Sequence, residues 1–186
     1  MCGIAGLIHR GKSSDVGREL QDMLQALKHR GPDSTGYALY GEGNNQGDYI
    51  MRFKVGENVA EGSSAVKEDK SVYDERRKQV DKHIRELGGS IVNDAQLTPY
   101  SFRYCIKYDK DLMEFSKKIE SVEMTEILSL GKSLELVKDI GDAGVVCGVL
   151  PDPGCAGCEV AHARTYAAGA DLLRLLLRLL PVDAVL

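Results

Sequence analysis

The stretch SSDVGRELQDMLQALKHRG, residues 13–31, constrains the fold of this chain more than any other segment. Its apolar side chains recur on one face at helical spacing: Val16, Leu20, Met23, Leu24 and Leu27. Ser13 or Ser14 can cap this helix, and Gly31-Pro32 ends it. The apolar runs 3–8 and 37–40 on either side are short and predict strands. The chain therefore opens with short strands around one amphipathic helix.

Further elements follow at regular intervals along the chain. A strand is predicted at 49–55, and shorter strands at 91–92 and 102–108. Helices are predicted at 64–87, which ends at Gly88-Gly89, and at 109–121. Segments 126–130 and 134–138 are predicted to pair as a hairpin about Gly131.

The composition changes near residue 147. All 13 lysines lie between Lys12 and Lys138, whereas residues 149–186 contain three arginines, two cysteines and many Leu and Ala. We therefore expect one domain over 1–146 and a compositionally different tail over 147–186. Either the tail is a helix-rich end of the domain, or it is not the natural continuation of the chain.

Composition also excludes classes of function. The net charge is −4 and no basic stretch is present, so we expect no nucleic-acid partner. Five scattered cysteines are typical of reduced thiols in a cytoplasmic protein. No secretory signal is visible, and the run LLRLLLRLL at 172–180 is too short to span a bilayer. We expect no membrane anchor, no metal and no cofactor.

Cys2 directly follows the initiator methionine. Once Met1 is removed, Cys2 carries both a thiol and a free α-amine. The amine has an ordinary pKa of about 7.7–8.0, and the thiol one of about 8.5. An unprotonated amine can therefore take the thiol proton without a second side chain. We interpret Cys2 as a candidate catalytic nucleophile.

The segment HRGPDSTG, residues 29–36, predicts a helix stop followed by a structural turn. Arg30 is a planar bidentate donor that suits a carboxylate. The turn itself is assigned to five residues: Gly31, Pro32, Asp33, Ser34 and Gly36. Arg30 either binds substrate or pairs with Asp33.

Together, MCGIAGLI and HRGPDSTG resemble the class II glutamine amidotransferases, which are N-terminal-nucleophile enzymes. The segment MTEILSLGKSLELVKDIGDAG is similar to the amidotransferase subunit of glutamate-synthase-like systems. The resemblance covers about residues 1–146. It implies an α+β fold, a four-layer αββα sandwich of two antiparallel sheets between helices.

The resemblance also implies a glutaminase half-reaction. Cys2 would attack the side-chain amide of glutamine and form a γ-glutamyl thioester, ammonia would leave, and water would release glutamate. The ammonia would pass to a synthase subunit or domain. Glutamine is the implied substrate.

Two family features are missing or altered. The oxyanion of this family is typically bound by an Asn-Gly motif, and the chain contains no such dipeptide. The substrate carboxylate is typically held by an arginine of a His-x-Arg segment, for which the only candidate is Arg164 in AHARTYAA. We therefore expect an incomplete amidotransferase domain, and an inactive, truncated form is the alternative.

Two other classes of function stay open. Cys155 and Cys158 form a CxxC pair, with Cys147 and His162 nearby in sequence, which suggests redox or zinc chemistry. The Leu-rich stretch 172–180 suggests a non-catalytic interaction module.

Overall fold

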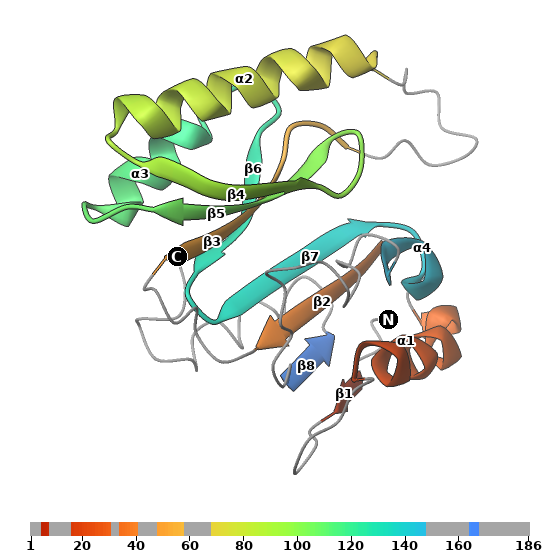
Figure 1. Ribbon diagram of the computed structural model, residues 1–186. Helices are drawn as coiled ribbons and strands as arrows, with labels where there is room; N and C mark the ends of the chain where they lie inside the picture. Colours follow the sequence, from red (N-terminus) through yellow and green to blue (C-terminus); the bar gives the residue numbers. More distant parts are fainter. Residues whose placement is uncertain are drawn as a thin grey trace. The chain divides into compact units, whose positions relative to one another are not determined.

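The computed structural model describes residues 5–7, 16–30, 34–40, 48–57, 68–147 and 164–167 (Figure 1). They fall into two compact units, each with one four-stranded antiparallel sheet and two α-helices. Unit 1 takes its residues from 1–42 and 133–185, and unit 2 from 43–132. The predicted α+β class with antiparallel sheets is confirmed. No helix within the described ranges is both long enough and apolar enough to cross a membrane.

Unit 1 combines elements from both ends of the chain. They are β1 (Ala5–Leu7), α1 (Val16–Ala26), a 3₁₀ turn (Lys28–Arg30), β2 (Ser34–Tyr40), β7 (Leu134–Ile140), α4 (Ala143–Cys147) and β8 (Arg164–Ala167). Sheet A has the strand order β1-β8-β2-β7, and every neighbouring pair is antiparallel. Strand β8 comes from the lysine-free tail segment and lies between β1 and β2.

Helix α1 confirms the strongest sequence prediction, with two differences. Leu20 and Leu24 are buried, as the apolar stripe predicts. Met23 lies at the margin of that stripe and is 39% exposed. The α-helix also ends earlier than predicted, at Ala26, because the amide of Leu27 bonds the carbonyl of Leu24 at 2.9 Å and tightens the chain into a 3₁₀ turn.

Unit 2 has the element order βαββαβ. Its elements are β3 (Tyr49–Lys54), α2 (Lys70–Glu86), β4 (Ser90–Gln96), β5 (Ser101–Lys107), α3 (Leu112–Ile119) and β6 (Glu126–Gly131). Sheet B has the order β4-β5-β3-β6, all antiparallel. This order is that of a ferredoxin-like split βαβ arrangement. Both helices lie on the same face of the sheet (Figure 1).

The core of unit 2 forms between sheet B and its two helices. Phe53 of β3 contacts the aromatic rings of Phe102 and Tyr104 on β5, with ring centroids 5.4 and 4.9 Å away. The helices bury Val80, Ile84, Phe115 and Ile119 against these strands. Apolar residues alternate along β3 and β5, so one sheet face is apolar and packs on the helices.

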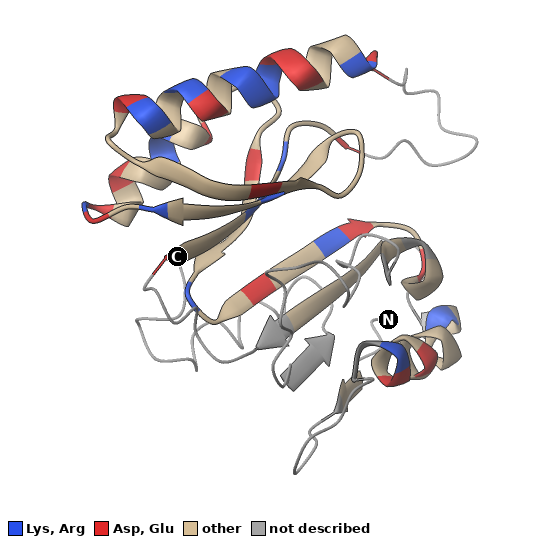
Figure 2. Ribbon diagram, in the orientation of Figure 1, with Lys and Arg blue, Asp and Glu red and all other residues tan. Residues whose placement is uncertain are grey.

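Both helices of unit 2 begin at an aspartate. The side chain of Asp69 accepts the amide of Ser71 at 3.1 Å, and that of Asp111 accepts the amide of Met113 at 2.8 Å. These N-caps set helix starts later than the predicted 64 and 109. The predicted stop after α2 is confirmed, because Gly88 adopts a φ of 88°. Lys and Arg alternate with Asp and Glu along α2, so neither sign of charge dominates its surface (Figure 2).

The predicted hairpin about Gly131 is wrong. Both strands exist, but β6 pairs with β3 in sheet B and β7 pairs with β2 in sheet A. The residues between them, Lys132 and Ser133, join the two units instead of forming a hairpin turn.

Candidate functional site

Strands β1 and β2 begin at the same end of sheet A. Gly6 of β1 and Ala38 of β2 both pair with Tyr166 of β8, so β1 and β2 run in the same direction on either side of β8. Strands β7 and β8, which run the opposite way, end there. We call this end the candidate edge and define it by the Ser34–Ile140 pair. Strands β1 and β8 reach only as far as Ala5 and Ala167, one residue beyond the level of Ala38 and roughly 10 Å short of Ser34.

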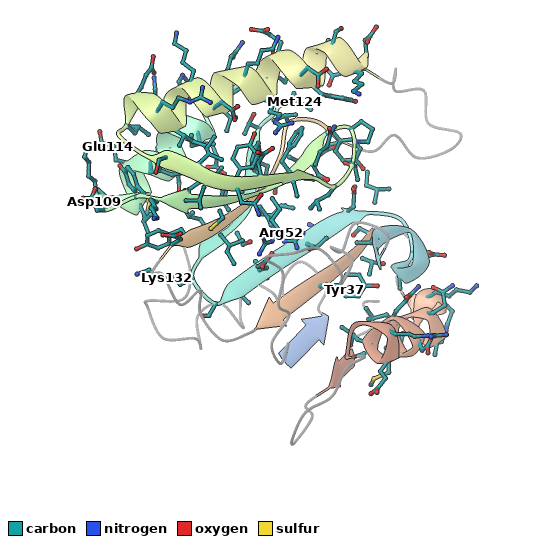
Figure 3. The ribbon with its side chains drawn as sticks, in the orientation of Figure 1. Tyr37, Arg52, Asp109, Glu114, Met124 and Lys132 are labelled. Carbon is teal, nitrogen blue, oxygen red and sulfur yellow. The ribbon has the colours of Figure 1, made fainter. Side chains whose placement is uncertain are left out.

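The candidate edge brings together two segments that are far apart in sequence. Ser34 pairs with Ile140. The Thr35 hydroxyl donates to the carbonyl of Gly141 at 2.8 Å. The Tyr37 hydroxyl donates to the carbonyl of Ala143 at 2.8 Å, and Figure 3 labels Tyr37. Tyr37 is only 1% exposed. The end of HRGPDSTG and the end of VKDIGDAG are therefore held against each other.

The second of these segments is shaped by local hydrogen bonds. Asp139 is buried, and its carboxylate accepts the amide of Ile140 at 2.8 Å. Gly141 has a φ of 122°, which allows the sharp turn out of β7. The carboxylate of Asp142 then accepts the amide of Gly144 at 3.0 Å at the start of α4. Backbone groups thus form a tight turn beside the start of β2.

The residues of the proposed nucleophile and turn are placed only in part. Cys2, Gly31, Pro32 and Asp33 lie outside the described residues. Arg30 ends the 3₁₀ turn, four residues before β2. Ser34 and Gly36 belong to strand β2 and not to the predicted turn, because their backbones pair with Ile140 and Lys138 of β7.

The position of Gly36 does not require a glycine. A Cβ atom built on Gly36 would lie 3.4 Å from the carbonyl oxygen of Val137, at the short end of ordinary contact. The strand would therefore accept a small side chain here.

Arg164 is the first residue of β8, and its backbone pairs with Tyr40. Ser34 starts the same strand that Tyr40 ends, and six residue steps of a strand span roughly 20 Å. The backbone of Arg164 therefore lies at the end of sheet A away from the candidate edge, whereas Arg30 precedes Ser34 by four residues in sequence. Cys155, Cys158, His162 and the stretch 172–180 lie outside the described residues.

Sequence reasoning missed Thr35 and Tyr37. Their hydrogen-bond partners lie 106 residues further along the chain, so no local pattern marks them. Cys147 ends α4. In the part of the chain that the structure describes, no group of three or more His, Cys, Asp or Glu side chains is placed to hold a metal ion.

The sequence matches a protein of Methanothermobacter thermautotrophicus named "Putative glutamine amidotransferase" with 32% identity over 145 residues. The chain is thus similar to a glutamine amidotransferase. The match covers 76% of this chain and 44% of that protein, so the chain spans less than half the length of this glutamine amidotransferase relative. No protein-family profile matches the chain, and no solved structure matches it.

Proposed function

We propose that this chain is a glutamine amidotransferase of the class II, N-terminal-nucleophile type, with Cys2 as its nucleophile. One structural observation carries the proposal. Cys2 lies three residues before β1, HRGPD ends directly before β2, and both strands run in the same direction, away from the candidate edge. The similarity to a glutamine amidotransferase relative supports it further.

The proposed reaction begins with proton transfer from the Cys2 thiol to the α-amine exposed when Met1 is removed. The thiolate attacks the side-chain carbonyl carbon of glutamine and forms a tetrahedral oxyanion. The oxyanion then collapses and the C–N bond breaks. The departing nitrogen takes the proton held by the α-amine, ammonia leaves, and a γ-glutamyl thioester remains on Cys2. Water hydrolyses the thioester, which releases glutamate and regenerates the thiol.

Arg30 is the proposed partner of the substrate's α-carboxylate. A guanidinium binds a carboxylate through two parallel hydrogen bonds, which fixes the orientation of the bound amino acid. Arg164 is the second proposed candidate. We favour Arg30, because it precedes Ser34 by only four residues in sequence, whereas the backbone of Arg164 pairs with Tyr40 at the other end of β2.

The oxyanion has to be bound without an Asn-Gly motif. Loss of one oxyanion donor lowers kcat by about 10²–10³-fold in well-studied hydrolases. We therefore expect slow glutamine hydrolysis by this chain. The proposed amidotransferase portion is 1–146 together with β8, and its sheet A supplies one β layer of the αββα sandwich. A synthase subunit or domain is the proposed acceptor of the ammonia.

The experiment that tests this function measures glutamate and ammonia released from glutamine by the full chain. Cys2→Ala should abolish release, and Cys2→Ser should leave a much slower reaction because a hydroxyl is harder to deprotonate. Cys105→Ala is the matched control, since Cys105 lies on β5 of unit 2 and should leave the rate unchanged. Undiminished release by Cys2→Ala would refute the proposed nucleophile.

A further inference from the structure

Unit 2 is inserted between two strands that are hydrogen-bonded neighbours in sheet A. Strands β2 and β7 pair along their whole length, from Ser34 with Ile140 to Tyr40 with Leu134. The chain leaves sheet A after Tyr40, forms all of unit 2, and returns at Leu134. Because Tyr40 and Leu134 are partners, a short turn would suffice to join β2 to β7.

Unit 2 also begins and ends at adjacent positions. Ile50, near the start of β3, pairs with Gly131 at the end of β6. Its apolar core runs from Met51 to Leu130 and includes strands and helices of this unit alone. A segment whose two ends are neighbours and whose core is its own can be added to a loop of another domain without distorting that domain.

Two arginines of α2, Arg76 and Arg77, find hydrogen-bond partners within unit 2. The buried guanidinium of Arg76 donates to the carbonyl of Val55 at 3.0 Å and to both carboxylate oxygens of Glu68 at 2.6 and 2.9 Å. These bonds fasten helix α2 to the end of strand β3. The buried positive charge of Arg76 is thus neutralised by Glu68, a residue of the same unit.

A second polar group fastens α2 to β5. Arg77 donates from Nε to the Tyr104 hydroxyl at 2.7 Å, and that hydroxyl donates to Asp81 at 2.7 Å. Burial raises the pKa of Tyr104, so the phenol stays a neutral donor at physiological pH. The guanidinium of Arg77 also lies over the ring of Phe102.

From this topology we propose that residues 43–132 form an inserted module that folds independently of unit 1 and takes no part in the glutamine chemistry. The second half of the statement rests on the proposed function. The insertion point supports it: Tyr40 and Leu134 lie at the end of the β2–β7 pair opposite Ser34 and Ile140, roughly 20 Å along the strands from the candidate edge. Changes within the module need not alter that edge.

Hydrogen–deuterium exchange of the full chain tests the independence of the module. Phe115 is fully buried in α3 and packs on Tyr108 with ring centroids 4.7 Å apart. Phe115→Ala should raise the amide exchange of β3 and β5 by roughly a hundredfold or more. The exchange of β2 and β7 should stay within about twofold of the parent chain. The milder Ile119→Val should show the same pattern with a smaller change.

Leu24→Ala in α1 is the reciprocal control, because Leu24 is buried in unit 1. It should raise exchange in β2 and β7 and leave β3 and β5 unchanged. An equal rise in both units for either variant would mean a single cooperative domain and would overturn the proposal.

Glutamate release by the same variants tests the second part of the proposal, that residues 43–132 take no part in the glutamine chemistry. Phe115→Ala and Ile119→Val should retain the parent rate. Loss of glutamate release in a variant whose β2 and β7 exchange is unchanged would place the module in the chemistry and overturn that half. If the parent chain itself releases no glutamate, the proposed function fails, while the exchange pattern still decides whether the module is independent.

Discussion

The phenol hydroxyl of Tyr37 donates a 2.8 Å hydrogen bond to the backbone carbonyl of Ala143, 106 residues further along the chain. Together with the Thr35 bond to Gly141, it holds the turn after β7 against the start of β2. These contacts join the ends of the two segments that resemble glutamine amidotransferases. The two hydrogen bonds fix the candidate edge of unit 1, although all of unit 2 lies between β2 and β7 in the sequence.

Tyr37→Phe should destabilise unit 1. It removes the hydroxyl and leaves a buried carbonyl without this donor, at a cost of about 1–3 kcal/mol. Tyr108→Phe is the matched control, because its hydroxyl bonds the carbonyl of Asp111 at 3.4 Å in an exposed position. We expect that variant to change stability by about 0.5 kcal/mol or less. Urea denaturation followed by exchange measures each effect in its own unit, at β2 amides for Tyr37→Phe and at β5 amides for Tyr108→Phe. Equal losses of stability would contradict the assigned role of Tyr37.

Gly56→Ala should destabilise unit 2. A Cβ atom at Gly56 would lie 2.5 Å from Cε1 of Tyr73, whose ring is buried. Overpacking of this kind costs about 1–3 kcal/mol. Gly36→Ala is the control with an ordinary contact of 3.4 Å and should cost less.

A double variant checks the cause of the Gly56 effect. Tyr73→Leu removes the ring that the new methyl group would meet, so Gly56→Ala should cost less in a Tyr73→Leu background than in the parent chain. Equal costs in the two backgrounds would show that the clash with Tyr73 is not responsible.

The pair between Arg76 and Glu68 should make the stability of unit 2 depend on acidity. The hydrogen bond from Arg76 lowers the pKa of Glu68 from its usual value of 4.5. A lowered folded-state pKa stabilises the fold above the unfolded value, and this contribution is lost as the pH falls below 4.5 through the folded value. Denaturant midpoints at pH 7 and in that acid range measure the loss.

Glu68→Gln provides the comparison for that pH dependence. The variant should be about 1–2 kcal/mol less stable at pH 7, because Arg76 loses a charged partner. It should also lose less stability on acidification than the parent chain. Identical acid dependence in the two proteins would exclude Glu68 as the responsible group.

Arg30→Lys should raise the KM for glutamine with little change in kcat. Lysine keeps the charge but cannot form two parallel hydrogen bonds with a carboxylate, and the loss of one such bond is worth about tenfold in binding. Arg164→Lys should have the smaller effect, given its place at the other end of sheet A. Arg85→Lys, at an exposed position of α2, is the control. A larger effect for Arg164→Lys would exchange the two assignments.

Local patterns in the sequence predict most elements of this fold. Helices α1, α2 and α3 follow from apolar spacing and stop signals, and β3 and β5 from alternating apolar residues. Starts and ends are less accurate because they depend on single hydrogen bonds, such as those to Asp69 and Asp111. The strand β4 is predicted only at 91–92, since none of its residues is buried and its apolar pattern is weak.

Strand partners could not be predicted in the same way. Strands 126–130 and 134–138 are neighbours in sequence, which favoured a hairpin, yet their partners are β3 and β2. The energy of those pairs comes from residues 72 or more positions away, which no local pattern contains. The candidate site shares this property: its sequence motifs were visible, whereas the bonds of Thr35 and Tyr37 that join them were not.

The central claim is that Cys2, freed of Met1, is the nucleophile toward glutamine. Its most direct test is to treat the full chain with an electrophilic glutamine analogue, a chloroketone in place of the amide, and to locate the adduct by intact mass and peptide mapping. We expect one adduct, on Cys2 of chains that lack Met1, and protection of Cys2 by excess glutamine. An adduct on another cysteine, or equal labelling of Cys2→Ala, would contradict it.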